Sequence, residues 1–167
     1  RSDISLIFGA PKNTALFNII RQATEMNVKC IYPVVTDYTV NRNVNIEKLN
    51  LIAIEAAEQS ERLDVPKIFP ISALQCYISL LRDSTVIFCD ESGGLDPYDL
   101  VTNLRLSERS KLAILIGPEG GFSEEERQIL CSYKNSVRMT LGSTILKADT
   151  AVIVALSYAK QIIQSVS

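Results

Sequence analysis

Short apolar runs rich in Ile and Val recur along this chain, and helical patterns fall between them. Strands that are buried on both faces of a sheet have this composition. Alternation of strands and helices throughout predicts an α/β domain with a largely parallel sheet and helices on both faces. The predicted strands are Ile4–Gly9, Cys30–Val35, Lys67–Ile71, Thr85–Asp90, Leu112–Gly117 and Ser136–Leu141. The predicted helices cover residues 14–26, 46–62, 73–82, 97–106, 123–132 and 148–165.

The length and composition are those of one soluble globular domain. The chain has 167 residues, of which 47% are hydrophobic and 22% are charged. No apolar stretch approaches the roughly 20 residues that a membrane-spanning helix needs. Residues 1–8 also lack the basic-then-apolar layout of a signal peptide. We therefore predict a cytoplasmic protein without a membrane partner.

Histidine is absent from the sequence. This absence excludes Ser-His-Asp and Cys-His catalysis and any zinc site built on imidazole. The cysteines are far apart, among apolar neighbours and without a CxxC pair, which is typical of free buried thiols. Chemistry on this chain must use carboxylates, Lys or Arg, hydroxyls, backbone groups or a cofactor, and we expect no metal. The cysteines are Cys30, Cys76, Cys89 and Cys131.

Two further segments have a distinctive composition. Thr36–Asn45 is polar and rich in Asn, which predicts an exposed loop. The last predicted helix, residues 148–165, contains Ala151-Val-Ile-Val-Ala-Leu-Ser-Tyr-Ala159 and is apolar nearly all round. Such a helix is buried on more than one side, either in the core or against another subunit.

The glycines are concentrated after predicted strands. Apart from Gly9, every glycine lies between residues 93 and 142, behind the runs Thr85–Asp90, Leu112–Gly117 and Ser136–Leu141. Ligands of open α/β sheets bind beyond the carboxyl ends of the strands. Glycine at such a place lets the backbone take unusual angles and approach a ligand closely. These loops therefore predict a pocket that is built mainly from backbone.

The most distinctive segment is Leu112-Ala-Ile-Leu-Ile-Gly-Pro-Glu-Gly-Gly-Phe-Ser-Glu-Glu-Glu126. An apolar run ends in a glycine-rich turn, and Ser123 and Glu126 form an S-x-x-E capping box that opens the next helix. The chain has neither a GxxxxGK[ST] phosphate loop nor a GxGxxG fingerprint. Glu119 and the glutamates that follow it disfavour a polyphosphate. A cofactor with a positively charged reacting centre, such as S-adenosylmethionine, fits this turn better, although the spacing alone does not require it.

The segment Leu115-Ile-Gly-Pro-Glu-Gly-Gly-Phe-Ser-Glu-Glu-Glu126 resembles the signature of the SPOUT-class methyltransferases that modify N3 of a uridine in 16S ribosomal RNA of the small ribosomal subunit. Leu141-Gly-Ser-Thr-Ile-Leu-Lys-Ala-Asp-Thr-Ala151 resembles the last motif of that family. Pro11-Lys12, Arg21-Gln-Ala-Thr-Glu-Met-Asn-Val28 and Ile54-Glu-Ala-Ala-Glu-Gln-Ser-Glu-Arg62 also match. The similarity therefore spans nearly the whole chain in the same order.

The resemblance implies a SPOUT-type fold, in which the C-terminal part threads into a deep trefoil knot. It also implies that the loops Cys89–Gly94, Gly117–Gly121 and Thr140–Leu146 hold S-adenosyl-L-methionine at the interface of a homodimer. These are the same loops that the glycines single out. The implied cofactor-binding residues are Cys89, Asp90, Glu91, Ile116, Gly117, Gly120, Gly121, Leu141, Gly142, Ile145 and Leu146.

The resemblance also implies a chemistry. Uridine N3 carries a proton at neutral pH, so its methylation needs a base or stabilisation of the uracil anion. The candidate bases are Glu119 and Asp149, and Lys147 is the candidate that stabilises the uracil oxygens. The last motif of the family reads Leu-Gly-x-Arg-Ile-Leu-Arg-x-Glu-Thr, and this chain departs from it at Thr144, Lys147 and Asp149. Thr144 loses a charge outright, and Lys in place of Arg loses the bidentate fork.

The net charge is −2 and the pI is about 5.2, which is acidic for a protein that binds RNA by itself, because Lys and Arg supply most affinity for phosphates. No segment resembles the N-terminal PUA-like RNA-binding barrel of the family. We therefore expect residues 1–167 to form the SPOUT methyltransferase domain of a longer chain. Two alternatives stay open: a SPOUT methyltransferase that acts on a ribose 2′-hydroxyl or another base of rRNA or tRNA, and a non-catalytic RNA-binding or assembly protein.

Overall fold

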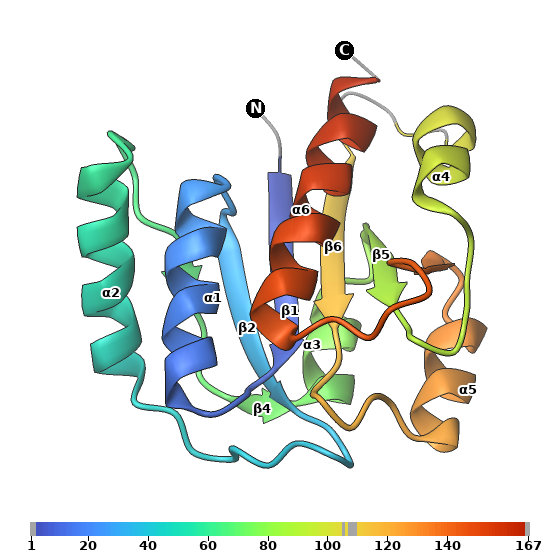
Figure 1. Ribbon diagram of the computed structural model, residues 1–167, viewed down its shortest axis with the longest axis horizontal. Helices are drawn as coiled ribbons and strands as arrows, with labels where there is room; N and C mark the ends of the chain where they lie inside the picture. Colours follow the sequence, from blue (N-terminus) through green and yellow to red (C-terminus); the bar gives the residue numbers. More distant parts are fainter. Residues whose placement is uncertain (1–2, 105, 107–109, 166–167) are drawn as a thin grey trace.

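The computed structural model describes residues 3–104, 106 and 110–165. A parallel sheet runs through the centre and helices cover both of its faces (Figure 1), as the alternating pattern predicts. The strands are β1 (Asp3–Gly9), β2 (Cys30–Val35), β3 (Lys67–Ile68), β4 (Ser72–Ala73), β5 (Ser84–Cys89), β6 (Lys111–Ile116) and β7 (Ser136–Met139). The helices are α1 (Asn13–Glu25), α2 (Ile46–Gln59), α3 (Leu74–Leu80), α4 (Pro97–Asn103), α5 (Glu124–Ser132) and α6 (Ala148–Gln164).

Each predicted strand and helix is present, but several ends differ. The strand predicted over Lys67–Ile71 is confirmed only as the short β3, because Pro70 has no N–H to continue the ladder. The two-residue strand β4 follows it and was not predicted. The helix predicted to reach residue 62 ends at Gln59, and Glu61 adopts the left-handed φ of 57°. The helix predicted over residues 97–106 includes residue 105, which lies outside the described residues. Helix α4 itself ends earlier, at Asn103. The expectation that all cysteines are buried is wrong for Cys76 and Cys131, whose side chains are exposed.

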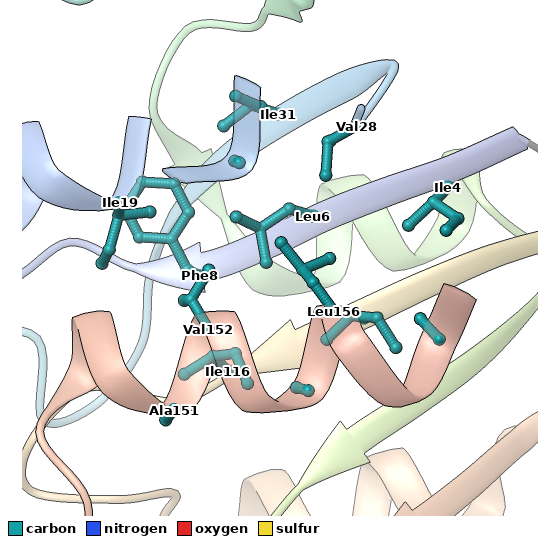
Figure 2. Packing of buried hydrophobic residues seen from close by; sticks show 14 of the residues in the cluster. Ile4, Leu6, Phe8, Ile19, Val28, Ile31, Ile116, Ala151, Val152 and Leu156 are labelled. Carbon is teal, nitrogen blue, oxygen red and sulfur yellow. The ribbon is translucent and has the colours of Figure 1, made fainter. Parts of the chain in front are cut away.

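Alternate residues of the strands supply two hydrophobic cores, one on each face of the sheet. Leu6 and Phe8 of β1 belong to the core under α1, α2, α4 and α6, whereas Ile7 belongs to the core under α3 and α5. Figure 2 shows Val152 of α6 beside Phe8. The apolar surface of α6 is covered largely within this chain, because the helix packs against α1, α4 and β6 at once. Leu156, for example, is buried in this core.

The strand order places the ends of β5, β6 and β7 side by side. The order is β3-β2-β1-β6-β5-β7, with β4 beside β2, and all of these pairs are parallel. Cys89 pairs with both Ile116 and Met139, so the last residues of the three strands form one row. The loops that follow these strands therefore all leave the sheet at the carboxyl ends of the strands.

The end of β7 lies between two parts of a single loop. On one side, the Asp90 N–H donates to the Met139 carbonyl at 3.2 Å. On the other side, the Leu95 N–H donates to the Arg138 carbonyl at 2.9 Å, and the Leu95 carbonyl accepts from Thr140 at 3.0 Å. Gly94, with a φ of 139°, permits this approach, because a Cβ there would lie 2.8 Å from the carbonyl carbon of Met139. The segment after β5 thus wraps around β7.

A buried carboxylate fixes this wrapped arrangement. The Asp90 side chain is only 1% exposed. Its carboxylate accepts a hydrogen bond from Arg127 Nε at 2.8 Å and lies 3.0 Å from Arg138 Nη2. The backbone N–H and hydroxyl of Ser92 donate to the same carboxylate at 3.2 and 3.1 Å. Burial by itself raises the pKa of Asp90, but the hydrogen bonds from Arg127 and Ser92 outweigh it and lower the pKa overall. The ionised carboxylate joins the loop after β5 to α5 and to β7.

We predict that Asp90→Asn lowers the free energy of unfolding at neutral pH by about 2–3 kcal/mol. Removing one partner of a buried ion pair leaves like charges facing each other, and the partial exposure of the two arginines moderates the cost. Urea denaturation followed by circular dichroism measures this change. Asp64→Asn is the matched control, because Asp64 is 69% exposed in its pair with Arg62 and should change stability by less than about 1 kcal/mol.

The pH dependence tests the cause of that loss. Because the folded pKa of Asp90 is lowered, its contribution is fully present above the unfolded value of about 3.9 and disappears as the pH falls through the folded pKa. The stability difference between the wild type and Asp90→Asn should therefore shrink below about pH 4. A difference that stays constant down to acid unfolding would contradict an electrostatic role.

Candidate functional site

A pocket opens where the loops after β5, β6 and β7 meet. It contains about 640 Å³ of space not occupied by atoms, a volume that includes the open solvent at its mouth. Its walls come from the loops after all three strands and from the first turn of α6. The lining residues are Cys89, Asp90, Glu91, Ile116, Gly117, Pro118, Glu119, Gly121, Phe122, Leu141, Gly142, Thr144, Ile145, Leu146, Ala148 and Ala151.

The structure brings together the residues that the sequence analysis assigned to the cofactor, with one exception. Gly120 does not line the pocket. It lies against the loop after β2, where an added Cβ would be 3.0 Å from the Cβ of Tyr38. Several lining residues were not among the predicted cofactor-binding residues, although they lie inside or beside the same motifs, and only that position could have indicated them. These are Pro118, Phe122, Thr144, Ala148 and Ala151.

The charges around the pocket have separate roles. Asp90 contributes to the wall, but its carboxylate is engaged by Arg127 and Arg138. Glu91 and Glu119 line the pocket with exposed side chains and make its rim negative. Such a rim favours a ligand that carries a positive charge.

Cys89 lines the pocket as a protonated thiol. Burial raises the pKa of Cys89 well above its ordinary value, and the negative charge of neighbouring Asp90 raises it further. A thiolate nucleophile at this position is therefore disfavoured.

The three candidate catalytic residues occupy different environments. Glu119 lines the pocket. Lys147 is the exposed N-cap residue of α6, and its neighbours Leu146 and Ala148 line the pocket. Asp149 is not a lining residue, since it sits in the first turn of α6 and accepts from Asn18 Nδ2 at 3.2 Å. This contact joins α6 to α1 and gives Asp149 a structural role.

The described part of the chain contains no group of three or more His, Cys, Asp or Glu side chains placed to hold a metal ion. Within the same residues, no helix has both the length and the apolar character that a membrane span requires.

Proteins with known sequences resemble this chain over nearly all of its length. A ribosomal RNA small subunit methyltransferase E of Rickettsia conorii is 36% identical over 94% of this chain and 64% of its own. A protein of the same name in Bacillus subtilis is 31% identical over 89% of this chain and 62% of its own. The chain thus spans less than two thirds of the length of these two relatives.

Solved structures share the fold. The ribosomal RNA small subunit methyltransferase E of Neisseria gonorrhoeae, determined with bound S-adenosyl methionine, matches with a TM-score of 0.79 and 25% identity. This match covers 93% of the present chain and 64% of the other. A probable rRNA methyltransferase of Porphyromonas gingivalis matches with a TM-score of 0.82 at 24% identity, over 98% of this chain and 69% of its own.

The match to a protein family agrees with the fold and with the position of the pocket. Residues 1–160 fit the family described as RNA methyltransferase domain. That range contains every strand, the wrapped segment around β7 and all of the loops that form the pocket. The chain therefore belongs to the RNA methyltransferase domain family.

Proposed function

We propose that this chain is the S-adenosylmethionine-dependent catalytic domain of a cytoplasmic enzyme that methylates N3 of a uridine in 16S rRNA of the small ribosomal subunit. The observation that carries the proposal is the pocket formed by three loops at one row of strand ends. Relatives named as small-subunit ribosomal RNA methyltransferases support the substrate, and the Neisseria gonorrhoeae structure with bound S-adenosyl methionine supports the cofactor.

The residues of the pocket fit this cofactor. The apolar side chains of Ile116, Phe122 and Leu141 offer a surface for the adenine ring. The exposed carboxylates of Glu91 and Glu119 complement a sulfonium charge. Gly142, at a φ of 113°, leaves open space beside its backbone.

When bound, S-adenosylmethionine supplies an electrophilic methyl group. The chain has to hold uridine N3 in line with it and to remove the N3 proton. We assign proton removal to Glu119, because its carboxylate is at the pocket and Asp149 is engaged with Asn18. We assign stabilisation of the uracil oxygens to Lys147, whose exposed side chain stands beside the pocket wall.

We also propose that the C-terminal part forms a deep trefoil knot. The backbone contacts that hold the end of β7 between Asp90 and Leu95 support this threading. The chain then continues through the pocket loop into α6, which packs back against α1 and β6. Such topologies are rare exceptions among folds.

Loss of the gene should remove one 3-methyluridine from 16S rRNA, as measured by nucleoside analysis of RNA from a deletion strain. A gene that carries Glu119→Gln should fail to restore it, because general-base catalysis contributes about 10²–10⁴ to the rate. Glu124→Gln should restore it, since Glu124 is an exposed glutamate of α5 outside the pocket. Loss of a 2′-O-methylated nucleoside instead would favour the first alternative function, and an unchanged nucleoside content would favour the non-catalytic one.

Gly142→Val should weaken the binding of S-adenosylmethionine by about tenfold or more in isothermal titration calorimetry. Valine at a φ of 113° is strained by about 1–3 kcal/mol, so the free loop should relax out of the geometry that binds the cofactor. Each 1.4 kcal/mol needed to restore that geometry costs about tenfold in affinity. Glu61→Val is the control, because Glu61 is also left-handed, at 57°, but lies beyond α2. The absence of binding heat from the wild-type chain at millimolar ligand would refute the proposed cofactor.

We propose that the chain is a homodimer through the surface that carries Leu95, Tyr98, Ile145 and Ile153. These large apolar side chains are 53%, 72%, 77% and 39% exposed. Tyr98 lies in α4, and Leu95 precedes the N-cap residue of that helix. Ile145 lies in the pocket loop after β7, and Ile153 lies in α6, which packs against α4. Large exposed apolar side chains on neighbouring elements support a protein interface here.

Light scattering should report about twice the chain mass of 18.5 kDa, and Ile153→Glu should convert the dimer to a monomer because a buried unpaired charge costs several kcal/mol. Leu51→Glu, at the exposed surface of α2, should leave the dimer intact. Leu156→Glu is unsuitable for this test, since Leu156 is 1% exposed and belongs to the core of the single chain. A wild-type monomer at high concentration would overturn the proposal.

A further inference from the structure

The loop between β2 and α2 is ordered by its own hydrogen bonds, although its composition predicts an exposed loop. Thr36 and Thr39 are buried, and the Thr36 N–H donates to the Thr39 hydroxyl at 2.9 Å. The two hydroxyls lie 2.7 Å apart, and the Thr39 N–H donates to the Thr36 carbonyl at 3.2 Å. These bonds form a compact turn with Asp37 and Tyr38 at its tip.

This turn is fastened to the segment that forms the pocket. The capping-box residue Glu126 accepts from the Ser123 N–H at 2.9 Å through one oxygen and from the Asp37 N–H at 3.1 Å through the other. The Asp37 carboxylate accepts a hydrogen bond from the Ser123 hydroxyl. Gly120 permits the contact, since a Cβ there would lie only 3.0 Å from the Cβ of Tyr38. The absence of a side chain at Gly120 therefore makes room for Tyr38; Gly120 itself does not line the pocket.

The ring of Tyr38 is available to a ligand. The residue is 52% exposed, and it lies against Gly120, between the pocket-lining residues Glu119 and Gly121. Within the described residues, the Tyr38 side chain makes no hydrogen bond, ring stack or cation contact. The ring of Phe122, by contrast, packs on Phe88 in the core. An exposed aromatic ring beside the candidate cofactor pocket offers a surface on which a planar group can stack.

Two exposed cationic residues lie in or next to the loop that carries this ring. Asn41 Nδ2 donates to the Pro11 carbonyl at 3.0 Å, which fastens the same loop to the start of α1. Lys12 and Arg42, next to these two residues, are both exposed. Cations beside a stacking ring are the combination with which proteins hold single-stranded nucleic acid.

We infer that Tyr38 is a stacking platform for an unpaired RNA base beside the pocket, with Lys12 and Arg42 on the flanking phosphates. The inference rests on the proposed function, because an enzyme that modifies a base must hold it outside the RNA stack. Tyr38 acts here as a substrate-positioning residue. Its role is to hold a base while Glu119 and Lys147 face the group to be modified.

The sequence permits a direct test, because it contains no tryptophan. A Tyr38→Trp variant therefore has a single indole, and a base stacked on it should quench its emission. Titration with short single-stranded oligouridylate should give saturable quenching. Leu63→Trp is the matched control, since Leu63 is fully exposed and precedes β3, whereas Tyr38 follows the parallel strand β2 at its other end; the emission of this variant should not change. Quenching that is equal in both variants, or absent from both, would overturn the inference.

A series of substitutions separates stacking from charge. Tyr38→Ala and Tyr38→Leu should weaken oligouridylate binding by about tenfold, whereas Tyr38→Phe should stay within about twofold of the wild type, because only the aromatic face is needed. None of these variants should change the salt dependence of binding, but Arg42→Ala should reduce it. Fluorescence anisotropy of a labelled oligouridylate measures both quantities. Equal affinities for Tyr38→Leu and Tyr38→Phe would contradict stacking.

Calorimetry with S-adenosylmethionine distinguishes this inference from the proposed function. Tyr38→Ala should bind the cofactor like the wild type, since Tyr38 does not line the pocket. If the wild-type chain binds no cofactor, the proposed function fails, and the oligouridylate titrations still decide the role of Tyr38. If Tyr38→Ala loses both ligands, Tyr38 supports the loop and is not a stacking surface.

Discussion

The ion-pair cluster of Asp90 is the contact on which the site depends. One buried carboxylate receives Arg127 from α5 and Arg138 from β7 while its own backbone pairs with Met139. The three elements that carry the pocket loops therefore meet at a single charge. A partner-free carboxylate in this position would be strongly destabilising, and paired with two arginines it stays ionised. This arrangement makes the pocket a product of the fold and not of flexible loops.

The pocket itself follows from the register of a parallel sheet. Cys89, Ile116 and Met139 form one row, so each following loop begins at the same height. Glycines and apolar residues line much of the wall, and Glu91 and Glu119 add an acidic rim. Glu126 also fastens the loop of Tyr38, the proposed substrate platform, to the segment that forms the wall. The proposed cofactor and base sites are therefore neighbouring parts of one fold.

Much of the fold could be predicted from local pattern. The Ile- and Val-rich runs gave the strands, and the capping box of Ser123 and Glu126 marked the start of α5. Strand β4 was not predicted, because two residues are too few to show a periodic hydrophobic pattern. The burial of Cys76 and Cys131 was predicted wrongly, because apolar neighbours in sequence do not fix which way a side chain points. The loop Thr36–Asn45 is exposed at most of its residues, as predicted, but Thr36 and Thr39 are buried and hydrogen-bond to each other.

The sequence by itself determined the alternation of strands and helices and the glycine-rich loops after the last strands, because both are properties of neighbouring residues. Only the tertiary structure decided which side chains those loops leave free. In the folded chain, the Asp90 carboxylate pairs with Arg127 and Arg138, Asp149 accepts a hydrogen bond from Asn18, and Gly120 lies against Tyr38. Each of these contacts joins residues that are distant in sequence, and the order of strands in the sheet determines which of them meet. Local periodicity carries no information about that order.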